Sequence, residues 1–286
     1  MYAITGITGK VGGAAARALR AAGLSVRAVL RDEAKAAAWK NRGCEIAFAD
    51  MSDAAALTSA FAGTEGVFIL PPPAFDPQPG FPEARRVIAA VTAALKRAQP
   101  GKVVCLSTIG ADALQENLLT QRGLLEQALS GIGIPVTFLR PGWFMENALQ
   151  DVQAARDEGV LRSFLQPADK AFPMVATQDV GHAAARLLRE DWRGMRIAEL
   201  EGPARVSPND LAQAFATALE RPVRVEIVRR ESWEEIFRNQ GARNPTPRMR
   251  MLDGFNEDWI SFRGPTEKGT TALASVIAEL TSTNHN

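Results

Sequence analysis

The chain has 286 residues, enough for one large α/β domain or for a nucleotide domain with a smaller cap, and 46% of them are hydrophobic. Its formal net charge of +1 argues against electrostatic capture of nucleic acid or of an anionic membrane. We find no basic leader of a signal peptide and no uncharged apolar run of about 20 residues, so we expect a cytoplasmic protein without a membrane span.

Short apolar strands alternate with alanine- and leucine-rich helices up to residue 140. The predicted strands cover residues 2–5, 25–30, 45–48, 66–70, 102–107 and 135–139, and the clearest helices cover residues 11–22 and 83–99. Continuous apolar strands separated by helices form parallel sheets, because each helix carries the chain back to the start of the next strand. The pattern therefore predicts an α/β fold with a doubly wound parallel sheet.

The pattern becomes less regular after residue 140. Helices are predicted near residues 147–158, 177–190 and 207–220, the last capped by Ser207, and a strand is predicted at 223–229. Residues 232–286 read as mostly helical, with a polar tail at 281–286 that we expect to be frayed. We predict a nucleotide-binding domain at 1–142 and a smaller α+β substrate domain at 143–286, with segments near 175–200 returning to the first domain.

Neither cysteine has a partner nearby in the sequence. Cys44 and Cys105 fall within predicted strands, and no second cysteine or histidine lies close to either of them. We interpret both as small core residues of a reducing compartment, and we expect neither a disulfide nor a metal site.

A glycine-rich turn follows the first strand and opens the first helix. Gly6, Gly9 and Gly12 have the spacing of a dinucleotide cradle, in which one glycine makes the turn, one leaves room for the phosphate and one packs the helix against the strand. The helix start offers free N–H groups to the pyrophosphate, and Thr5 and Thr8 add hydroxyl donors. The turn therefore predicts a bound dinucleotide.

Positive residues after the second strand favour NADP over NAD. Arg31 ends this strand, Lys35 lies one turn further on and Lys10 lies in the glycine turn, and such a cluster suits a 2′-phosphate. The adjacent Asp32 leaves NAD open. Asp50 ends the third strand, where its carboxylate can accept from the adenine amino group.

Six segments together resemble one known family. TGITGKVGG, VLRDEAKA, FADMSD, LSTIGA, IPVTFLRPGWFMEN and VATQDVGHAAARLL, in this order and spacing, are similar to the NmrA-like branch of the atypical short-chain dehydrogenases. The resemblance covers nearly the whole chain. It implies a Rossmann domain with a small C-terminal domain, and it is nearest to NADPH-dependent quinone oxidoreductases and sugar-epimerase-like members. The family also contains redox-sensing regulators that bind NAD(P) without known turnover.

The resemblance and the residues together predict the site. The resemblance implies cofactor binding by Gly6, Thr8, Gly9, Lys10, Val11, Gly12, Arg31, Leu70, Pro71, Pro72, Pro141, Gly142, Trp143 and Phe144. The residue pattern adds Lys35, Asp50 and Arg122 for the cofactor, and we expect Pro73, Ser107, Thr108 and Trp143 to meet the substrate. The aromatic residues Phe75 and Phe81 border the proline run and are candidates for the wall of a flat, apolar substrate pocket. Residues 243–259 form either a pocket lid or a surface helix.

The chain departs from the usual Tyr-x-x-x-Lys pair of short-chain dehydrogenases. Its one tyrosine, Tyr2, lies in the first strand, while Leu118 and Arg122 stand where the pair would be. Arg122 keeps the charge and can position the cofactor, but an arginine is no acid or base near neutral pH. We expect His182 to be a packed structural residue, and His285 lies in the tail.

Hydride transfer to an activated acceptor needs little help from side-chain acids. We therefore predict an NADP-dependent oxidoreductase that reduces a small planar acceptor such as a quinone or enone. The alternative is a non-catalytic NADP(H) sensor that acts on a protein partner. The sequence leaves the substrate and the oligomeric state open.

Overall fold

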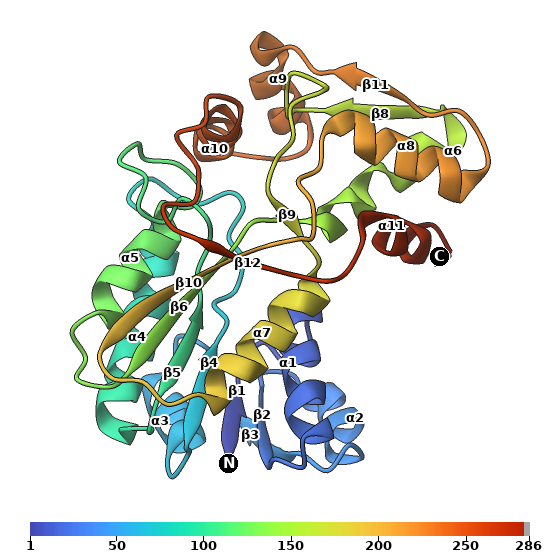
Figure 1. Cartoon of the computed structure of the whole chain (residues 1–286). Helices are drawn as coiled ribbons and strands as arrows, with labels where there is room; N and C mark the ends of the chain where they lie inside the picture. Colours follow the sequence, from blue (N-terminus) through green and yellow to red (C-terminus); the bar gives the residue numbers. More distant parts are fainter. Residues whose placement is uncertain (283–286) are drawn as a thin grey trace.

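The computed structural model describes residues 1–282. It contains one large sheet with helices on both faces, and a smaller part that lies beyond one end of the strands (Figure 1). The sheet is parallel, and its eight strands have the order β12-β10-β6-β5-β4-β1-β2-β3. These strands are β1 (Tyr2–Ile4), β2 (Val26–Leu30), β3 (Glu45–Phe48), β4 (Gly66–Ile69), β5 (Val103–Leu106), β6 (Val136–Pro141), β10 (Met195–Glu201) and β12 (Thr266–Lys268). The predicted doubly wound α/β fold is confirmed.

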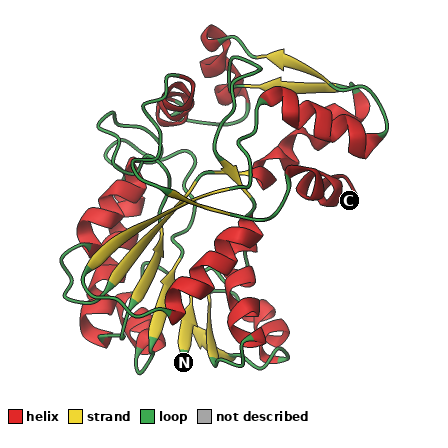
Figure 2. Cartoon of the chain, viewed as in Figure 1, coloured by secondary structure: helices red, strands yellow, loops and turns green. Residues whose placement is uncertain are grey.

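Each face of the sheet is covered by its own helices (Figure 2). One face carries α1 (Lys10–Ala21), α2 (Ala36–Lys40) and α7 (Thr177–Arg189), and the other carries α3 (Ala54–Phe61), α4 (Pro82–Ala98) and α5 (Thr120–Leu129). Helices α1 and α7 cross closely at Gly181. A Cβ built on this glycine would lie 2.5 Å from the Cβ of Ala14, so a larger residue would not fit there. This crossing fixes a late segment of the chain on the half that contains the first strands of the sheet.

The sheet has two strands that the sequence pattern did not predict as strands. β10 pairs with β6 inside the segment that we expected to return to the first domain, and β12 pairs with β10 at the sheet edge. Only three residues, Thr-Glu-Lys, make up β12, and its polar side chains are held by Glu201, which accepts hydrogen bonds from Thr266 and Lys268 at 2.7 and 2.8 Å. An edge strand needs no apolar run, and this one has none.

The smaller part contains short elements around a separate aromatic core. Its elements are β7 (Trp143–Phe144) paired with β9 (Met174–Val175), β8 (Val160–Ser163) paired with β11 (Arg224–Ile227), a 3₁₀ segment η2 (Met145–Asp151), α6 (Val152–Asp157), α8 (Pro208–Leu219), η3 (Arg230–Ser232), α9 (Trp233–Asn239), α10 (Thr246–Asn256) and α11 (Leu273–Ser282). Phe164 packs against Trp233 and Phe237, with ring centroids 5.7 and 5.0 Å apart. We call this part the cap.

Several cap predictions are confirmed and others change. Ser207 caps α8 in a reciprocal pair with Asp210, as expected. The helix predicted near 147–158 is instead split between η2 and α6, and the predicted strand is shorter. The end of the tail, with His285, lies outside the described residues. Among the described residues, no helix combines the length and apolarity needed to cross a membrane.

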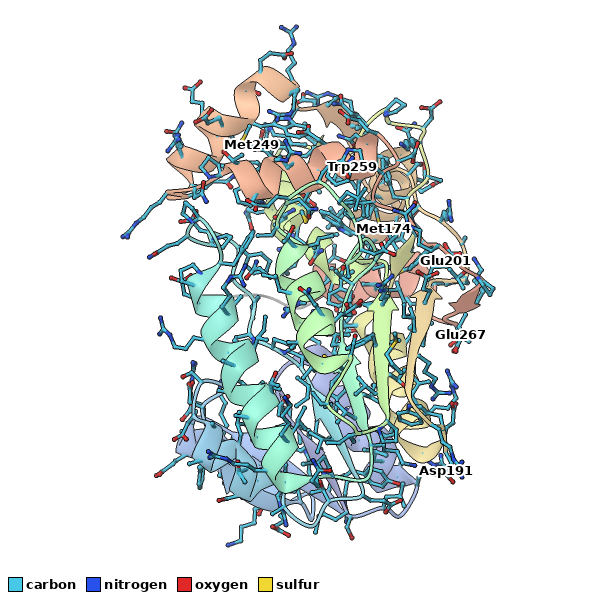
Figure 3. The ribbon with its side chains drawn as sticks, turned by 90° about the vertical axis from the view of Figure 1, so that its left-hand side faces the viewer. Met174, Asp191, Glu201, Met249, Trp259 and Glu267 are labelled. Atoms are coloured by element: carbon cyan, nitrogen blue, oxygen red, sulfur yellow. The ribbon has the colours of Figure 1, made fainter. Side chains whose placement is uncertain are left out.

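Side views place the cap at one end of the sheet. In Figure 3, Met249 and Trp259 lie in the cap, Glu201 and Glu267 lie beside the end of the sheet that faces it, and Asp191 lies at the opposite end. Cys105 lies in β5, whereas Cys44 precedes β3 rather than lying in it; both thiols are buried and unpaired. The cap thus lies beyond the carboxyl ends of the strands, the edge at which ligands bind in such folds.

Candidate functional site

The three glycines of the turn between β1 and α1 have three separate roles. Gly6 has φ +61°, a left-handed conformation that favours glycine, and a Cβ there would meet the Leu70 side chain at 3.0 Å. A Cβ on Gly12 would overlap the Gly6 carbonyl oxygen, so this glycine lets α1 start close to the strand. A Cβ on Gly9 would touch only the Gly6 oxygen, at 3.4 Å. Gly9 is therefore the one whose side-chain space is open toward solvent.

The N-terminus of α1 is open to an anion. Gly9 is its N-cap residue and no side chain caps the helix, while Thr8, Gly9 and Lys10 are all exposed. The first backbone N–H groups of a helix have no partner within the helix. The turn therefore fits a phosphate group, which would accept from these N–H groups.

The expected role of Thr5 is wrong. Its side chain is buried, and its hydroxyl donates to the Phe68 carbonyl at 3.0 Å and accepts from the Leu70 N–H at 2.8 Å. Thr5 thus ties the glycine turn to the end of β4 and has no donor left for a phosphate.

The predicted cations are all exposed: Arg31 directly follows β2, Lys35 ends the short turn after it, and Lys10 begins α1. Arg31, Lys35 and Lys10 make no ion pair within residues 1–282. Asp32 accepts from the Ala34 N–H at 3.0 Å and so caps the next turn. Asp50 accepts from the backbone and hydroxyl of Ser52, and these bonds, together with the charge of Arg31, lower the pKa of its carboxyl.

The proline run after β4 borders a cavity of about 270 Å³. Pro71 is buried, whereas Pro72 and Pro73 are exposed. Two neighbouring residues of α5 donate hydrogen bonds to the backbone of this loop. Gln121 Nε2 donates to the Ala74 carbonyl at 3.0 Å, and Arg122 Nη2 donates to the Pro71 carbonyl at 3.3 Å. Sequence reasoning singled out Arg122 and missed Gln121, although the two are adjacent.

Arg122 lies in that cavity without an acidic partner. No carboxylate oxygen within residues 1–282 lies at ion-pair distance from its guanidinium. Burial lowers the pKa of Arg122, a shift that the nearby Cys105 partly opposes. Leu118, which stands where the family's tyrosine would be, is buried among apolar cap residues.

Ser107 faces a buried ion-pair cluster. Its hydroxyl donates to Glu126, which also accepts from Arg140 at 2.9 and 2.6 Å, and Arg140 also binds Asp112 at 3.0 Å. Although burial alone would lower it, the bonds to Glu126 and Asp112 raise the pKa of Arg140 above its ordinary value. The hydroxyl expected to meet substrate is therefore directed at Glu126, while Thr108 is half-buried and makes no such bond.

The segment after β6 joins the two halves of the molecule. A Cβ on Gly142 would overlap the carbonyl oxygen of Pro173, so glycine is required where the chain leaves β6 and passes the residue before β9. Trp143 then packs edge-on against Phe255 of the cap, with centroids 5.3 Å apart, while Phe144 packs on the core beneath α1. Pro141 and Gly142 are buried, whereas Trp143 and Phe144 are both half-buried.

Two of the expected pocket walls have different surroundings. Phe81 is 3% exposed and starts α4, so it belongs to the core, whereas Phe75 is 68% exposed. The loop that carries Phe75 is fastened to the cap, because both Asp76 oxygens accept from backbone N–H groups, of Arg243 at 2.9 Å and Asn244 at 2.7 Å. The sequence contained no signal for this link.

The expectation of a packed His182 is wrong. His182 is exposed on the outer side of α7, whose buried face is formed by the alanine and leucine residues that follow. Within residues 1–282, no three side chains of metal-binding type lie together.

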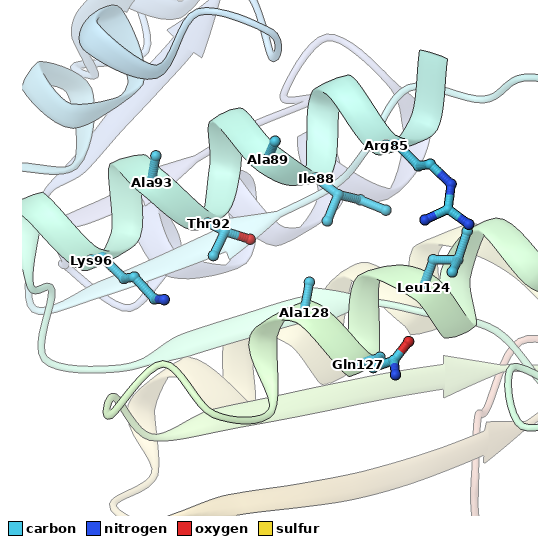
Figure 4. Close-up of a pocket in the computed structure, with 9 residues that line it drawn as sticks. All are labelled: Arg85, Ile88, Ala89, Thr92, Ala93, Lys96, Leu124, Gln127 and Ala128. Atoms are coloured by element: carbon cyan, nitrogen blue, oxygen red, sulfur yellow. The ribbon is translucent and has the colours of Figure 1, made fainter. Parts of the chain in front are cut away.

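A second, larger cleft of about 510 Å³ lies between α4 and α5 (Figure 4). Its lining residues are Arg85, Ile88, Ala89, Thr92, Ala93, Lys96, Leu124, Gln127 and Ala128. It contains none of the predicted site residues and follows the outer sides of the two helices rather than the carboxyl edge of the sheet. Despite its size, it is therefore the poorer candidate for the cofactor site.

Asp151 should make stability depend on pH. Burial raises the pKa of its carboxyl to about 7, and it has no hydrogen-bond or charge partner in the described chain. The unfolded chain loses this proton near pH ~3.9 and the folded protein keeps it until about 7, so the free energy of unfolding falls as the pH rises between these values.

We expect Asp151→Asn to unfold with about 1–3 kcal/mol more free energy than wild type at pH 8, and with the same free energy below pH ~4, as measured by urea unfolding. Asp169→Asn, at an exposed position without a partner, should change nothing at either pH. A gain of Asp151→Asn that is the same at both pH values would rule out ionisation as the cause.

Comparison with known proteins agrees with this geometry. The model of the NmrA-like family matches residues 2–266. An NAD(P)H azoreductase of Xenophilus azovorans is 29% identical over 244 residues, 84% of this chain and 82% of that protein. Quinone oxidoreductase 2 of Escherichia coli K12 is 32% identical over 215 residues, 74% of this chain and 72% of that protein.

A solved structure has the same fold over its full length. The NADPH-dependent quinone oxidoreductase of Escherichia coli, complexed with NADPH, superposes with a TM-score of 0.83 at 25% identity and covers 98% of this chain and 99% of that one. Since the family match spans nearly every element of the sheet and most of the cap, the chain belongs to the NmrA-like family.

Proposed function

We propose that the protein is an NADP-dependent oxidoreductase that reduces a small planar acceptor such as a quinone or enone. The observation that carries the proposal is the open glycine turn, with its uncapped helix and the unpaired cations beside it. The relatives support the reaction class, because their names describe NAD(P)H- or NADPH-dependent reduction of azo compounds and quinones.

The turn and the strand ends would hold the cofactor as follows. The N-terminal N–H groups of α1 would receive the pyrophosphate over Gly9, with Thr8 and Lys10 beside it. Arg31 and Lys35 would bind the 2′-phosphate, and the Asp50 carboxylate would accept from adenine. Asp32 favours NADP over NAD, because its carboxylate already caps the next turn and is not available for a ribose 2′-hydroxyl.

The nicotinamide half would lie between the proline run and the segment after β6. Leu70, Pro71 and Pro72 would lie under it, Arg122 would fix its ribose, and Pro141 to Phe144 would border the ring. Trp143 with Pro73 and Thr108 would bound the acceptor. Such a wall excludes water and presents a flat apolar surface, which suits a planar acceptor.

The chemistry needs few protein groups. When bound, the dihydronicotinamide supplies the hydride. The protein positions the acceptor, and the reduced acceptor takes its proton from water, since the tyrosine of the usual pair is replaced by the buried Leu118. Reduction of an unactivated ketone, or epimerisation of a sugar, would lack the acid that it needs.

The replacement of the usual tyrosine by Leu118 also favours a second candidate function, that of a sensor without turnover. A protein that binds NADP(H) but lacks a proton donor is suited to report the redox state to a protein partner. The two functions differ in turnover, since only the enzyme consumes NADPH.

We expect NADPH oxidation, followed by absorbance, with at least one member of a panel of benzoquinones and naphthoquinones. The rate should vary little between pH ~6 and ~8, because the proposed hydride transfer uses no acid or base of the protein. Arg122→Ala should lower the rate or weaken NADPH binding, whereas His182→Gln should change neither. Tight NADPH binding without oxidation by any quinone would instead support the sensor.

A further inference from the structure

A short strap lies at the rim of the cavity beneath the proline run. Residues 75–80 run from Ala74 toward the start of α4, and we call them the strap (Figure 1). Ala74 and Glu83, which lie on either side of the strap in the chain, both line the cavity of about 270 Å³. The strap therefore forms part of the rim of this cavity, which belongs to the site proposed for the nicotinamide half of the cofactor.

Asp76 fastens the strap to the cap. Its two carboxylate oxygens accept from the backbone N–H groups of Arg243 at 2.9 Å and Asn244 at 2.7 Å, and Asn244 Nδ2 donates to the Pro77 carbonyl at 2.8 Å. Within residues 1–282, these three hydrogen bonds are the ones that join the strap to the cap, and we call them the latch. The two N–H groups lower the pKa of the Asp76 carboxyl, so it stays ionised at neutral pH and its bonds are charge-assisted.

The segments on both sides of the latch are fixed independently of it. On the sheet side, the buried Gln121 of α5 holds Ala74 through the 3.0 Å bond from its Nε2 to the Ala74 carbonyl. On the cap side, the Leu118 N–H donates to the Pro247 carbonyl at 2.9 Å, and this bond holds the start of α10. The strap is therefore the part that moves when the latch breaks.

Little besides the latch holds the outer part of the strap. Five of its six residues are exposed, Pro77 being the exception, and Phe75 is 68% exposed. At its far end Gly80 and Phe81, with φ +76° and +58°, are two consecutive left-handed residues, and Arg85 Nε holds the Gly80 carbonyl at 2.8 Å. A few loop residues of this kind can absorb the dihedral change of a hinge. Since few apolar contacts are lost, opening the strap needs much less free energy than unfolding the protein.

We propose that the strap is a gate on the nicotinamide and acceptor pocket, held closed by the Asp76 latch. The proposal rests on the proposed function for the identity of the ligand. The closed strap restricts the exchange of ligand and water at the rim, and ligand enters and leaves through the open state. Removing the latch should therefore raise the association and dissociation rates by a similar factor and leave Kd nearly unchanged. The loss of a direct contact to the cofactor would instead raise Kd.

Amide hydrogen exchange in the protein without cofactor, followed by NMR, tests the latch itself. The Arg243 and Asn244 amides should exchange about tenfold faster in Asp76→Ala than in wild type, because they lose their acceptor. The Val104 amide, in the buried strand β5, should exchange at the same rate in both proteins. Equal rates for Arg243 and Asn244 in the two proteins would show that the latch is not formed in solution, and would overturn the proposal.

Stopped-flow mixing with NADPH, followed by its fluorescence, tests the gate. In Asp76→Ala, the association and dissociation rate constants of NADPH should both rise about tenfold, with Kd changed by less than about threefold. Asn244→Ala removes the bond to Pro77 without changing the charge, and it should raise both rate constants about threefold. Asp169→Ala is the matched control, because it removes an exposed carboxylate that has no partner within residues 1–282, and it should change neither rate constant.

The gate is contradicted if Asp76→Ala leaves both rate constants unchanged, or if it raises Kd through the dissociation rate alone, since Asp76 would then act as a binding contact. It is also contradicted if Asp169→Ala has the same effect as Asp76→Ala, since the loss of charge would then be the cause. In these cases the proposed function stands and only the gate is lost. If wild type binds no NADPH at all, the proposed function fails and the gate fails with it.

Discussion

Gly9→Val is expected to weaken NADPH binding about a hundredfold or more while the protein stays folded. The reason is the division of roles within the turn. A side chain at Gly6 or Gly12 would collide with the protein itself, whereas at Gly9 it would meet only one oxygen at 3.4 Å and then extend into the space proposed for the pyrophosphate. Overfilling a close contact costs up to about 3 kcal/mol, which is roughly a hundredfold in affinity.

The measurement is NADPH titration by calorimetry, with far-ultraviolet circular dichroism and thermal unfolding on the same samples. Gly131→Val is the matched control, because a Cβ at that exposed glycine meets nothing within 4 Å. It should bind NADPH normally. If Gly9→Val also binds NADPH as wild type does, the pyrophosphate does not lie on this turn.

Arg31→Ala is expected to reduce NADPH affinity about ten- to a hundredfold and to leave NADH affinity nearly unchanged. A charge-assisted contact to a 2′-phosphate contributes roughly 1.5–3 kcal/mol, and NADH lacks that phosphate. Arg31 is exposed and unpaired, so its removal breaks no ion pair that holds the fold.

Calorimetric titration of both cofactors into wild type, Arg31→Ala and Arg86→Ala tests this result. Arg86→Ala removes an exposed charge from the far side of the sheet and should affect neither cofactor. Equal wild-type affinity for NADPH and NADH would contradict the preference for NADP, and equal losses for both cofactors in Arg31→Ala would place Arg31 elsewhere on the dinucleotide.

The sheet was predictable where burial dictates sequence. β4 and β5 are buried throughout and read as continuous apolar runs, so their positions followed from the sequence. β12 is an edge strand of three polar residues, held by backbone pairing with β10 and by Glu201, and no periodicity marks such a strand. Its place in the sheet depends on a partner more than sixty residues earlier in the chain.

The candidate site was predictable where one local segment builds it. The glycine turn is such a segment: the turn at Gly6 and the close packing at Gly12 both followed from the spacing, while the phosphate role of Gly9 stays a prediction. The site was less predictable where segments far apart in the sequence meet. The sequence could not show that the Thr5 hydroxyl donates to the Phe68 carbonyl, that the Ser107 hydroxyl donates to Glu126, or that Asp76 accepts from the backbone of the cap.

His182 illustrates a related error. Its helix was predicted correctly, but which side of a helix is exposed depends on how the helix sits on its neighbours. Gly181 and the alanines that follow form the face against α1, and this rotates His182 outward. Small residues, rather than the largest ones, define the buried face of α7.

The strand order has a consequence for synthesis. At one edge the sheet takes its last two strands from residues 195–201 and 266–268, and most of the cap is made between them. A ribosome releases the amino-terminal strands first, so β6 and then β10 each stand for a time as an unpaired edge. Unpaired edges are templates for another chain. The growing polypeptide is therefore most prone to aggregate before residue 268 emerges, and a product truncated after α10 keeps that exposed edge permanently.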